Sequence, residues 1–263
     1  LSLLAFFNVG KSLPQDNLNQ KNDFNSVKEK REVKLYKLGI GDKLRIDINL
    51  IIQGLNLLRV IHPKGPGSFE RERAEELAEM GFAVLVADVY GGQRANDNDE
   101  AAALMNPLME DRGGVLKDRL HASVAALQSH ELVDASRCAA IGYCFGGLCV
   151  LDLARSGADL RAVVSFHGLL AGHEFEATPL ASVLACHGWD DPMATPEAVV
   201  EFGAEMTKIG ADWQLHGYGN AMHAFTNPEA NDPSFGTVYD VTADARSFRS
   251  MVDFLFERLE ADE

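Results

Sequence analysis

The stretch Ile141-Gly-Tyr-Cys-Phe-Gly-Gly147 joins a short apolar run to a segment with the pattern of a helix. Glycines stand two residues before and two residues after Cys144, where they remove side chains that would clash in a sharp strand-to-helix turn. Such a turn places the thiol at a helix N-terminus, where exposed N–H groups and the helix dipole favour thiolate. An ordinary turn with a packed cysteine would give the same pattern, so the chemical interpretation depends on partners elsewhere in the chain.

A candidate carboxylate follows in the turn His187-Gly-Trp-Asp-Asp-Pro192. This turn comes just after an apolar run, so its carboxylates would lie past the C-terminal end of a strand, where α/β sheets build their sites. We choose Asp191, three residues after Gly188, as the group that orients a base. Asp190 is the alternative, and either residue could cap the next helix.

A candidate base is His223, in the loop Tyr218-Gly-Asn-Ala-Met-His-Ala-Phe-Thr-Asn-Pro228. The loop is rich in small residues, which makes a packed core histidine less favourable here than on an apolar helix face. His223 would take the thiol proton and pass it to a leaving alkoxide, while Asp191 fixes its tautomer. The order cysteine, aspartate, histidine is the one that a strand-to-helix elbow of this type requires.

Helix-like and strand-like segments alternate after residue 65, a pattern typical of βαβ units and a mostly parallel sheet with helices on both faces. The run 82–88 is apolar almost throughout, which indicates a strand buried on both faces. The last segment, 245–259, has apolar side chains at three- and four-residue steps and predicts an amphipathic helix. The other expected strands are 138–141, 160–166, 180–186 and 212–215, and the other expected helices are 69–80, 100–109, 114–129, 144–155 and 196–209.

The composition changes near residue 64. The first 64 residues carry a net charge of +5, from eleven Lys and Arg and six Asp and Glu, whereas residues 65–263 carry −20. We expect residues 1–32 to form a polar N-terminal arm, disordered or loosely attached, and residues 33–263 to form a single α/β domain. Strand-like runs at 34–38, 44–52 and 57–61 predict an antiparallel N-terminal edge of the sheet.

Composition also narrows the partners. No apolar run reaches the roughly 18 residues that a membrane helix needs, and the apolar opening 1–7 lacks the basic leader and cleavage site of a signal peptide. A net charge of −15 argues against nucleic acid and anionic membrane as partners. We therefore expect a protein that acts on a small molecule as a monomer or small homo-oligomer.

The four cysteines are too few and too scattered for a disulfide framework or a metal knuckle. Cys138, Cys149 and Cys186 have the pattern of small core residues. A working thiolate at Cys144 implies a reducing compartment, and we expect a cytoplasmic protein without metal or cofactor.

Four further residues are candidates for the walls of a pocket. The aromatic residues Tyr90, Trp189 and Phe225 stand next to the proposed active loops, where aromatic side chains bind substrate or pack with equal frequency. His167, in Ser165-Phe-His-Gly168, also ends a strand on the same side; we interpret it as structural or pocket-shaping, because a second base has no obvious task.

Several segments together resemble the dienelactone hydrolase family, whose namesakes are the carboxymethylenebutenolidases. The resemblance covers roughly residues 65–262 and rests on 71–81, 87–93, 142–147, 165–168, the Asp191 turn and the His223 loop. It implies a cofactor-free enzyme of the α/β-hydrolase fold that opens lactone or ester rings, and it places the family's triad on Cys144, Asp191 and His223.

The chain departs from the family pattern before the first predicted helix. Family members usually carry His-Glu-x-x-Gly there, and that glutamate holds the thiol until substrate arrives; this chain has Ile61-His-Pro-Lys-Gly65. The same loop should donate one oxyanion N–H, and Phe145 the other. Because Pro63 and Pro66 have no N–H, the loop donor would be Lys64 or Gly65.

A second departure concerns the two arginines with which dienelactone enzymes bind the substrate carboxylate. Arg94 is the candidate for one of them, and Asn227 occupies the position of the other. The leading hypothesis is therefore a hydrolase of a small ester or lactone that uses a Cys-His-Asp triad and a thioester acyl-enzyme. The alternatives are a thioesterase or general carboxylesterase on the same triad, and a non-catalytic binding protein that keeps the fold.

Overall fold

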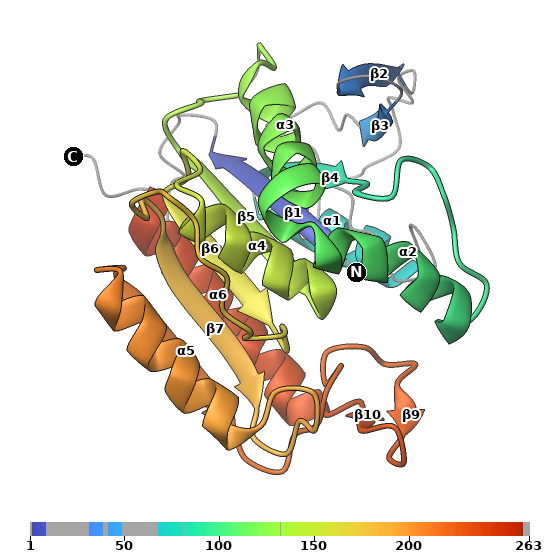
Figure 1. Cartoon of the computed structure of the whole chain (residues 1–263), viewed down its shortest axis with the longest axis vertical. Helices are drawn as coiled ribbons and strands as arrows, with labels where there is room; N and C mark the ends of the chain where they lie inside the picture. Colours follow the sequence, from blue (N-terminus) through green and yellow to red (C-terminus); the bar gives the residue numbers. More distant parts are fainter. Residues whose placement is uncertain are drawn as a thin grey trace, which may run out of the picture.

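The computed structural model describes residues 2–8, 32–38, 42–48, 68–80, 82–131 and 133–259. Its strands are β1 (Ser2–Asn8), β2 (Glu32–Leu38), β3 (Asp42–Ile48), β4 (Phe82–Ala87), β5 (Cys138–Tyr143), β6 (Ala162–Phe166), β7 (Ser182–Gly188), β8 (Trp213–Tyr218), β9 (Asn231–Asp232) and β10 (Thr237–Val238). Among these residues the main sheet has eight strands in the order β2-β3-β4-β1-β5-β6-β7-β8 (Figure 1). The strands β9 and β10 form a separate hairpin.

Strand directions confirm the predicted sheet. The strands β5, β6, β7 and β8 pair in parallel, and β4 runs in the same direction because β1 is antiparallel to both β4 and β5. At the N-terminal edge β2 pairs with β3, and β3 with β4, in antiparallel register. The carboxyl ends of β4 to β8 therefore meet at one edge of the sheet, where loops from distant parts of the sequence come together.

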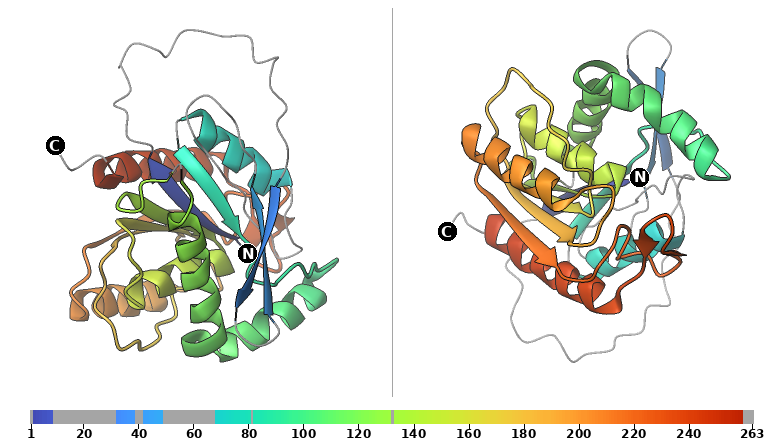
Figure 2. Two further views of the ribbon diagram at one scale, coloured as in Figure 1. Left: turned by 90° about the horizontal axis from the view of Figure 1, so that it is seen from above. Right: turned by 60° about the horizontal axis from the view of Figure 1, so that its bottom comes forward.

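Helices cover both faces of the sheet (Figure 2). The helices α1 (Ser68–Glu79) and α6 (Val241–Leu259) pack on one face, and α3 (Lys117–Gln128), α4 (Phe145–Arg155) and α5 (Pro196–Lys208) pack on the other. Side chains of β4 alternate between the two cores, as expected for a strand buried on both sides. Ala83, Leu85 and Ala87 face the core of α3, α4 and α5, and Phe82, Val84 and Val86 face that of α1 and α6.

Strand β1 corrects the predicted N-terminal arm. Residues 2–8 lie in the middle of the sheet instead of in a polar arm, with Leu3 opposite Ala87 of β4 and Gly142 of β5. The physical reason is the apolar run 3–7, which suits a strand covered by helices on both faces. The polar residues 9–31 lie outside the described residues, as does the run 57–61 that we expected to be a strand.

The helix predicted over 114–129 begins differently from the prediction. It follows α2 (Asn98–Glu110) through η1 (Arg112–Leu116), a single π-helical turn, before α3 starts. The carboxylate of Asp111 accepts the backbone N–H of Val115 at 2.9 Å, which caps the wider turn. Gly114 lies against that carboxylate, and a Cβ there would force the carboxylate to move. The Asp111 carboxylate thus binds the backbone and favours a π-helical turn where the apolar periodicity predicted the start of an α-helix.

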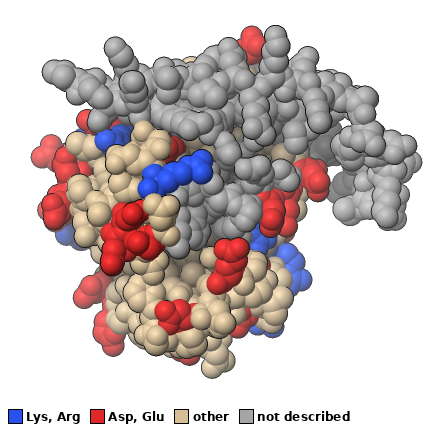
Figure 3. Space-filling view, turned by 90° about the vertical axis from the view of Figure 1, so that its right-hand side faces the viewer, with Lys and Arg blue, Asp and Glu red and all other residues tan. Residues whose placement is uncertain are grey.

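Acidic side chains gather at several places on the face shown in Figure 3, in keeping with the charge of −20 on residues 65–263. Within the described part of the chain, no helix combines the length and apolar character needed to cross a membrane.

A buried ionic network fixes α4 to its surroundings. Arg112 donates two hydrogen bonds to Asp152 of α4, at 2.8 and 2.7 Å, and Arg155 donates a third at 3.1 Å. Arg155 also binds both carboxylate oxygens of Glu205 on α5, at 2.9 and 2.8 Å. The two guanidiniums further bind backbone carbonyls of residues 170–172, so one cluster ties α4, α5, η1 and the loop after β6 together.

Removing the central carboxylate should destabilise the fold severely. Asp152→Ala leaves two buried guanidiniums without their shared partner, and we expect it to cost about 3–5 kcal/mol of unfolding free energy. Urea unfolding followed by circular dichroism measures this loss. Asp253→Ala, which removes an exposed carboxylate from α6, is the control and should change stability little; equal losses for the two variants would contradict the role of the network.

Candidate active site

The turn between β5 and α4 holds Cys144 in a strained conformation. Its φ is 57° and its ψ is −119°, a region that residues with side chains seldom adopt. A Cβ on Gly142 would collide with the carbonyl of Gly146, so the glycine before the turn is required for the close approach. The backbone N–H of Cys144 donates to the carbonyl of Phe166 on β6 at 3.0 Å, which anchors the turn to the neighbouring strand.

The structure brings Cys144, His223 and Asp191 into one hydrogen-bonded chain. His223 Nε2 lies 3.0 Å from Cys144 Sγ, and its Nδ1 lies 2.8 Å from Asp191 Oδ2. Asp191 and His223 are each 2% exposed, while Cys144 is partly accessible. The imidazole is therefore held between a shielded carboxylate and the thiol of a residue that is less buried than either partner.

Geometry also separates the two neighbouring aspartates. Asp190 is exposed, and its backbone N–H donates to the carbonyl of Ala221 at 2.9 Å. Asp191 turns inward to His223, and its other carboxylate oxygen accepts the backbone N–H of Met193 at 2.8 Å. The arrangement singles out Asp191 as the partner of the histidine.

The hairpin of β9 and β10 holds the backbone of His223, and the sequence analysis missed it. The N–H of His223 donates to the carbonyl of Gly236 at 2.9 Å, and its carbonyl accepts the N–H of Val238 at 3.1 Å. The available signal was the turn sequence Asp232-Pro-Ser-Phe-Gly236, in which Gly236 has φ 84°. The strands are too short to produce a hydrophobic pattern.

Electrostatics favour a thiolate–imidazolium pair. Burial alone would raise the pKa of the Cys144 thiol, but the charge of His223, its hydrogen bond and the Phe145 N–H bring that pKa below its usual value. Burial alone would lower the pKa of His223, but the Cys144 thiolate and the hydrogen bond to Asp191 raise it to about 10. Each charged group stabilises the other, which favours transfer of the thiol proton to the histidine.

The other three cysteines lie in the core, as the sequence predicted. All three are buried, and burial raises their pKa, to about 12 for Cys138 and Cys186 and well above the usual value for Cys149. Burial thus favours the protonated form of these three thiols, in contrast to Cys144.

One of the two predicted oxyanion donors can be placed. Phe145 is the first residue of α4, and its N–H hydrogen-bonds the Cys144 sulfur, beside which a developing oxyanion would form. Lys64, the second predicted donor, lies outside the described residues together with its alternative Gly65.

The predicted pocket residues lie in different environments. Tyr90 is 2% exposed, and burial, followed by the nearby Cys149 and Cys144, raises the pKa of its phenol. Trp189 is 46% exposed, whereas Phe225 is fully buried. Arg94 is exposed in the loop after β4. The roles of these residues in substrate binding stay predictions.

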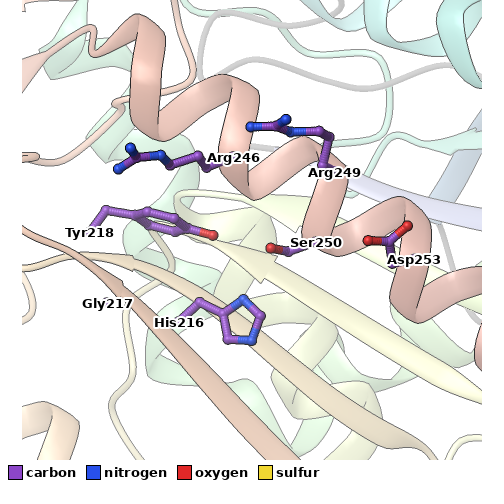
Figure 4. A pocket seen from close by; sticks show the side chains of 7 residues that line it. All are labelled: His216, Gly217, Tyr218, Arg246, Arg249, Ser250 and Asp253. Carbon is purple, nitrogen blue, oxygen red and sulfur yellow. The ribbon is translucent and has the colours of Figure 1, made fainter.

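A shallow hollow of about 630 Å³ lies elsewhere, between β8 and α6 (Figure 4). Its walls include His216 and Tyr218 from β8 and Arg246, Arg249 and Asp253 from α6. Cys144, His223 and Asp191 do not line this hollow. In the part of the chain that the structure describes, no cluster of three or more His, Cys, Asp and Glu could hold a metal ion.

A mostly parallel sheet covered on both faces, with a strand-to-helix elbow and a histidine loop at its carboxyl edge, defines an α/β-hydrolase. The sequence model of the Dienelactone hydrolase family matches residues 65–259. The chain belongs to this family, and the resemblance that we drew from its motifs is confirmed. The match begins where the composition changes.

Individual proteins are also similar to this chain. An uncharacterized protein of Caenorhabditis elegans is 40% identical over 57% of this chain and 98% of its own length. A protein of Bradyrhizobium sp., described as a probable 2-oxo-3-(5-oxofuran-2-ylidene)propanoate lactonase, is 32% identical over 61% of this chain and 69% of its own length. The crystal structure of a dienelactone hydrolase-like promiscuous phosphotriesterase from metagenomic libraries is 32% identical, with a TM-score of 0.76 over 87% of this chain and 98% of that one.

Alkylation by iodoacetamide should show that the thiolate of Cys144 persists below the usual thiol range. The alkylation rate should fall as pH drops through a midpoint lower than the ~8.5 of an unperturbed cysteine, because protonation of the thiolate removes the nucleophile. His223→Gln should raise that midpoint, since the stabilising charge is lost. Cys144→Ser should not be alkylated, because the remaining thiols are buried. An identical midpoint with and without His223 would contradict the ion pair.

Proposed function

We propose that this protein hydrolyses small esters or lactones through a Cys-His-Asp triad. Cys144 is the nucleophile, His223 the acid and base, and Asp191 the group that orients the histidine. The observation that carries the proposal is the hydrogen-bonded chain of Sγ, imidazole and carboxylate, with distances of 3.0 and 2.8 Å, at the carboxyl edge of the sheet. Membership of the dienelactone hydrolase family supports the reaction class.

Acylation begins with the proton already on His223. The Cys144 thiolate attacks the carbonyl carbon, and the carbonyl oxygen becomes an oxyanion that the N–H of Phe145 stabilises, with Lys64 as the proposed second donor. The C–O bond then breaks, and the imidazolium gives its proton to the leaving alkoxide. The product of this half-reaction is a thioester on Cys144 and a neutral histidine held by Asp191.

Deacylation returns the enzyme to its starting state. His223 takes a proton from a water molecule, and the hydroxide attacks the thioester carbonyl. The Cys144 thiolate leaves as the carboxylic acid product forms. The His223 imidazolium then pairs again with this thiolate. In a lactone the alkoxide and the carboxylate belong to one molecule, so ring opening follows the same steps.

Cysteine chemistry favours esters, lactones and thioesters over amides. From the tetrahedral intermediate a thiolate is a better leaving group than an unprotonated amine, so an amide substrate returns to starting material. A thioesterase or general carboxylesterase would use the same triad. The requirement for a free thiolate also leads us to place the protein in a reducing compartment such as the cytoplasm.

A second candidate activity is phosphotriester hydrolysis. The relative described as a promiscuous phosphotriesterase matches 87% of this chain at 32% identity. The thiolate of Cys144 could attack the phosphorus of paraoxon and displace p-nitrophenolate. p-Nitrophenyl esters release the same leaving group when they are hydrolysed. Paraoxon is therefore a useful second substrate beside lactones and short-chain esters.

Burst kinetics with p-nitrophenyl acetate test the proposal. The intact protein should release p-nitrophenolate in a rapid phase close to one equivalent, if deacylation is slower than acylation, and then turn over. Cys144→Ala should abolish both phases and retain the far-ultraviolet circular dichroism spectrum. Equal rates for both proteins would reject the enzyme and leave a binding protein with this fold.

The adjacent aspartates provide a matched pair of variants. Asp191→Asn should lower kcat by ~10³- to 10⁴-fold, because the amide no longer holds the histidine in the right tautomer or stabilises its charge. Asp190→Asn changes an exposed neighbour and should stay within about twofold of the intact protein. Ester hydrolysis by both purified variants measures the difference; comparable losses would contradict the assignment of Asp191.

A further inference from the structure

His167 occupies a strained and shielded position at the carboxyl end of β6. Its φ is 36°, in the region that non-glycine residues adopt only when their surroundings require it. Its side chain is 3% exposed, and Nε2 lies 2.9 Å from the hydroxyl oxygen of Thr226. The imidazole Nδ1 is buried without a hydrogen-bond partner among the described residues. The bond to Thr226 is thus the polar anchor that the structure shows for this ring.

Thr226 belongs to the loop that carries His223. The loop contains positive φ values of 61° at Asn220 and 56° at Ala224, so its backbone is held in an unusual path. Thr226 is 1% exposed and follows His223 by three residues. The hydrogen bond to His167 therefore joins this loop to β6, a strand that is fixed in the middle of the parallel sheet.

The two histidine rings are also in direct contact. The centroids of His167 and His223 are 5.1 Å apart with an interplanar angle of 64°, and His167 meets Phe225 edge-on at 5.2 Å. His167 thus lies beside the proposed base. It contacts the loop of His223 through one hydrogen bond, to Thr226, and through two ring contacts, to His223 and Phe225. A shift of Thr226 would move the loop that sets the position of the His223 imidazole.

We propose that His167 is a positioning residue for His223, which it holds within hydrogen-bonding distance of Cys144 by binding Thr226. This inference deepens the proposed function and rests on it. Besides the hydrogen bond between its ring and Asp191, the base is kept in place by the β9–β10 hairpin on its backbone and by the His167–Thr226 bond on its loop. His167 itself takes no part in proton transfer.

The charge state of His167 agrees with this role. Burial and the positive charge of His223 hold the pKa of His167 well below its usual value. The titratable groups that face it are Tyr143 from β5, His187 from β7 and His223 from its own loop. A neutral His167 ring does not repel the His223 imidazolium. It can therefore pack against His223 without lowering the pKa of that histidine.

The test uses the pH profile of Cys144 alkylation, which reports on the His223 charge without any substrate. Thr226→Val keeps the shape of the side chain and removes the hydroxyl, and Thr226→Ser keeps the hydroxyl. His167→Asn keeps a residue type that tolerates positive φ but is too short to reach Thr226. If the base is displaced, Thr226→Val and His167→Asn should raise the alkylation midpoint by up to about one pH unit, while Thr226→Ser stays near the intact protein.

A second measurement separates positioning from binding. With p-nitrophenyl acetate, Thr226→Val and His167→Asn should lower kcat by ~10-fold or more with little change in KM, since the substrate contacts are intact and the proton-transfer geometry is not. Thr226→Ser should recover most of kcat.

The control is another hydrogen bond between a histidine and a hydroxyl group, far from Cys144. His121 Nε2 lies 2.8 Å from the hydroxyl of Ser156, which follows the C-terminal end of α4, the opposite end from Cys144. Ser156→Ala should lower the melting temperature but leave the alkylation midpoint and kcat unchanged. If Thr226→Val and His167→Asn behave in the same way, the role of His167 is structural and the proposal is overturned. If these two variants raise the alkylation midpoint as expected but the intact protein has no esterase activity, the positioning role stands and only the proposed function is rejected.

Discussion

The strained turn at Cys144 is the constraint on which the site depends. A residue with a side chain is held at φ 57° because β5 and α4 are each fixed by burial, and Gly142 allows the backbone of the turn to close on Gly146. Strain of this kind costs on the order of 1–3 kcal/mol and persists only where the surroundings determine it. Here α4 is buried along its whole length, and its Asp152 is held by two arginines. The core thus holds the thiol at a helix N-terminus.

The resulting chemistry is a balance between burial and charge. A thiol in this position would lose acidity if burial acted alone, and a histidine would lose basicity. Their mutual attraction, with Asp191 on the far nitrogen, opposes both effects and favours the thiolate of Cys144, the proposed nucleophile. Such a pair is sensitive to small displacements, and two contacts hold the loop around His223: the β9–β10 hairpin binds its backbone, and His167 binds Thr226.

Much of this arrangement could be predicted from the sequence, because its signals are local or periodic. The apolar run 82–88, the glycines around Cys144 and the three-and-four spacing of α6 each reflect one element in its own environment. The triad candidates were found because parallel strands bring their carboxyl ends to one edge. Asp191 was preferred to Asp190 from its spacing to Gly188, but the directions of the two adjacent side chains could be seen only in the coordinates. Strand β1 was missed because its seven residues precede a long polar stretch, and η1 because one carboxylate at Asp111 alters the turn.

The central claim is that Cys144 carries the acyl group during hydrolysis. Intact-mass spectrometry of protein quenched in acid during turnover of p-nitrophenyl acetate, followed by peptide mapping, tests it most directly. If Cys144 is the nucleophile, the peptide that contains it carries one acetyl group, removable by hydroxylamine as a thioester is, and the same peptide of Cys144→Ala carries none. Turnover with the acetyl group on another residue, or undiminished turnover by Cys144→Ala, would contradict it.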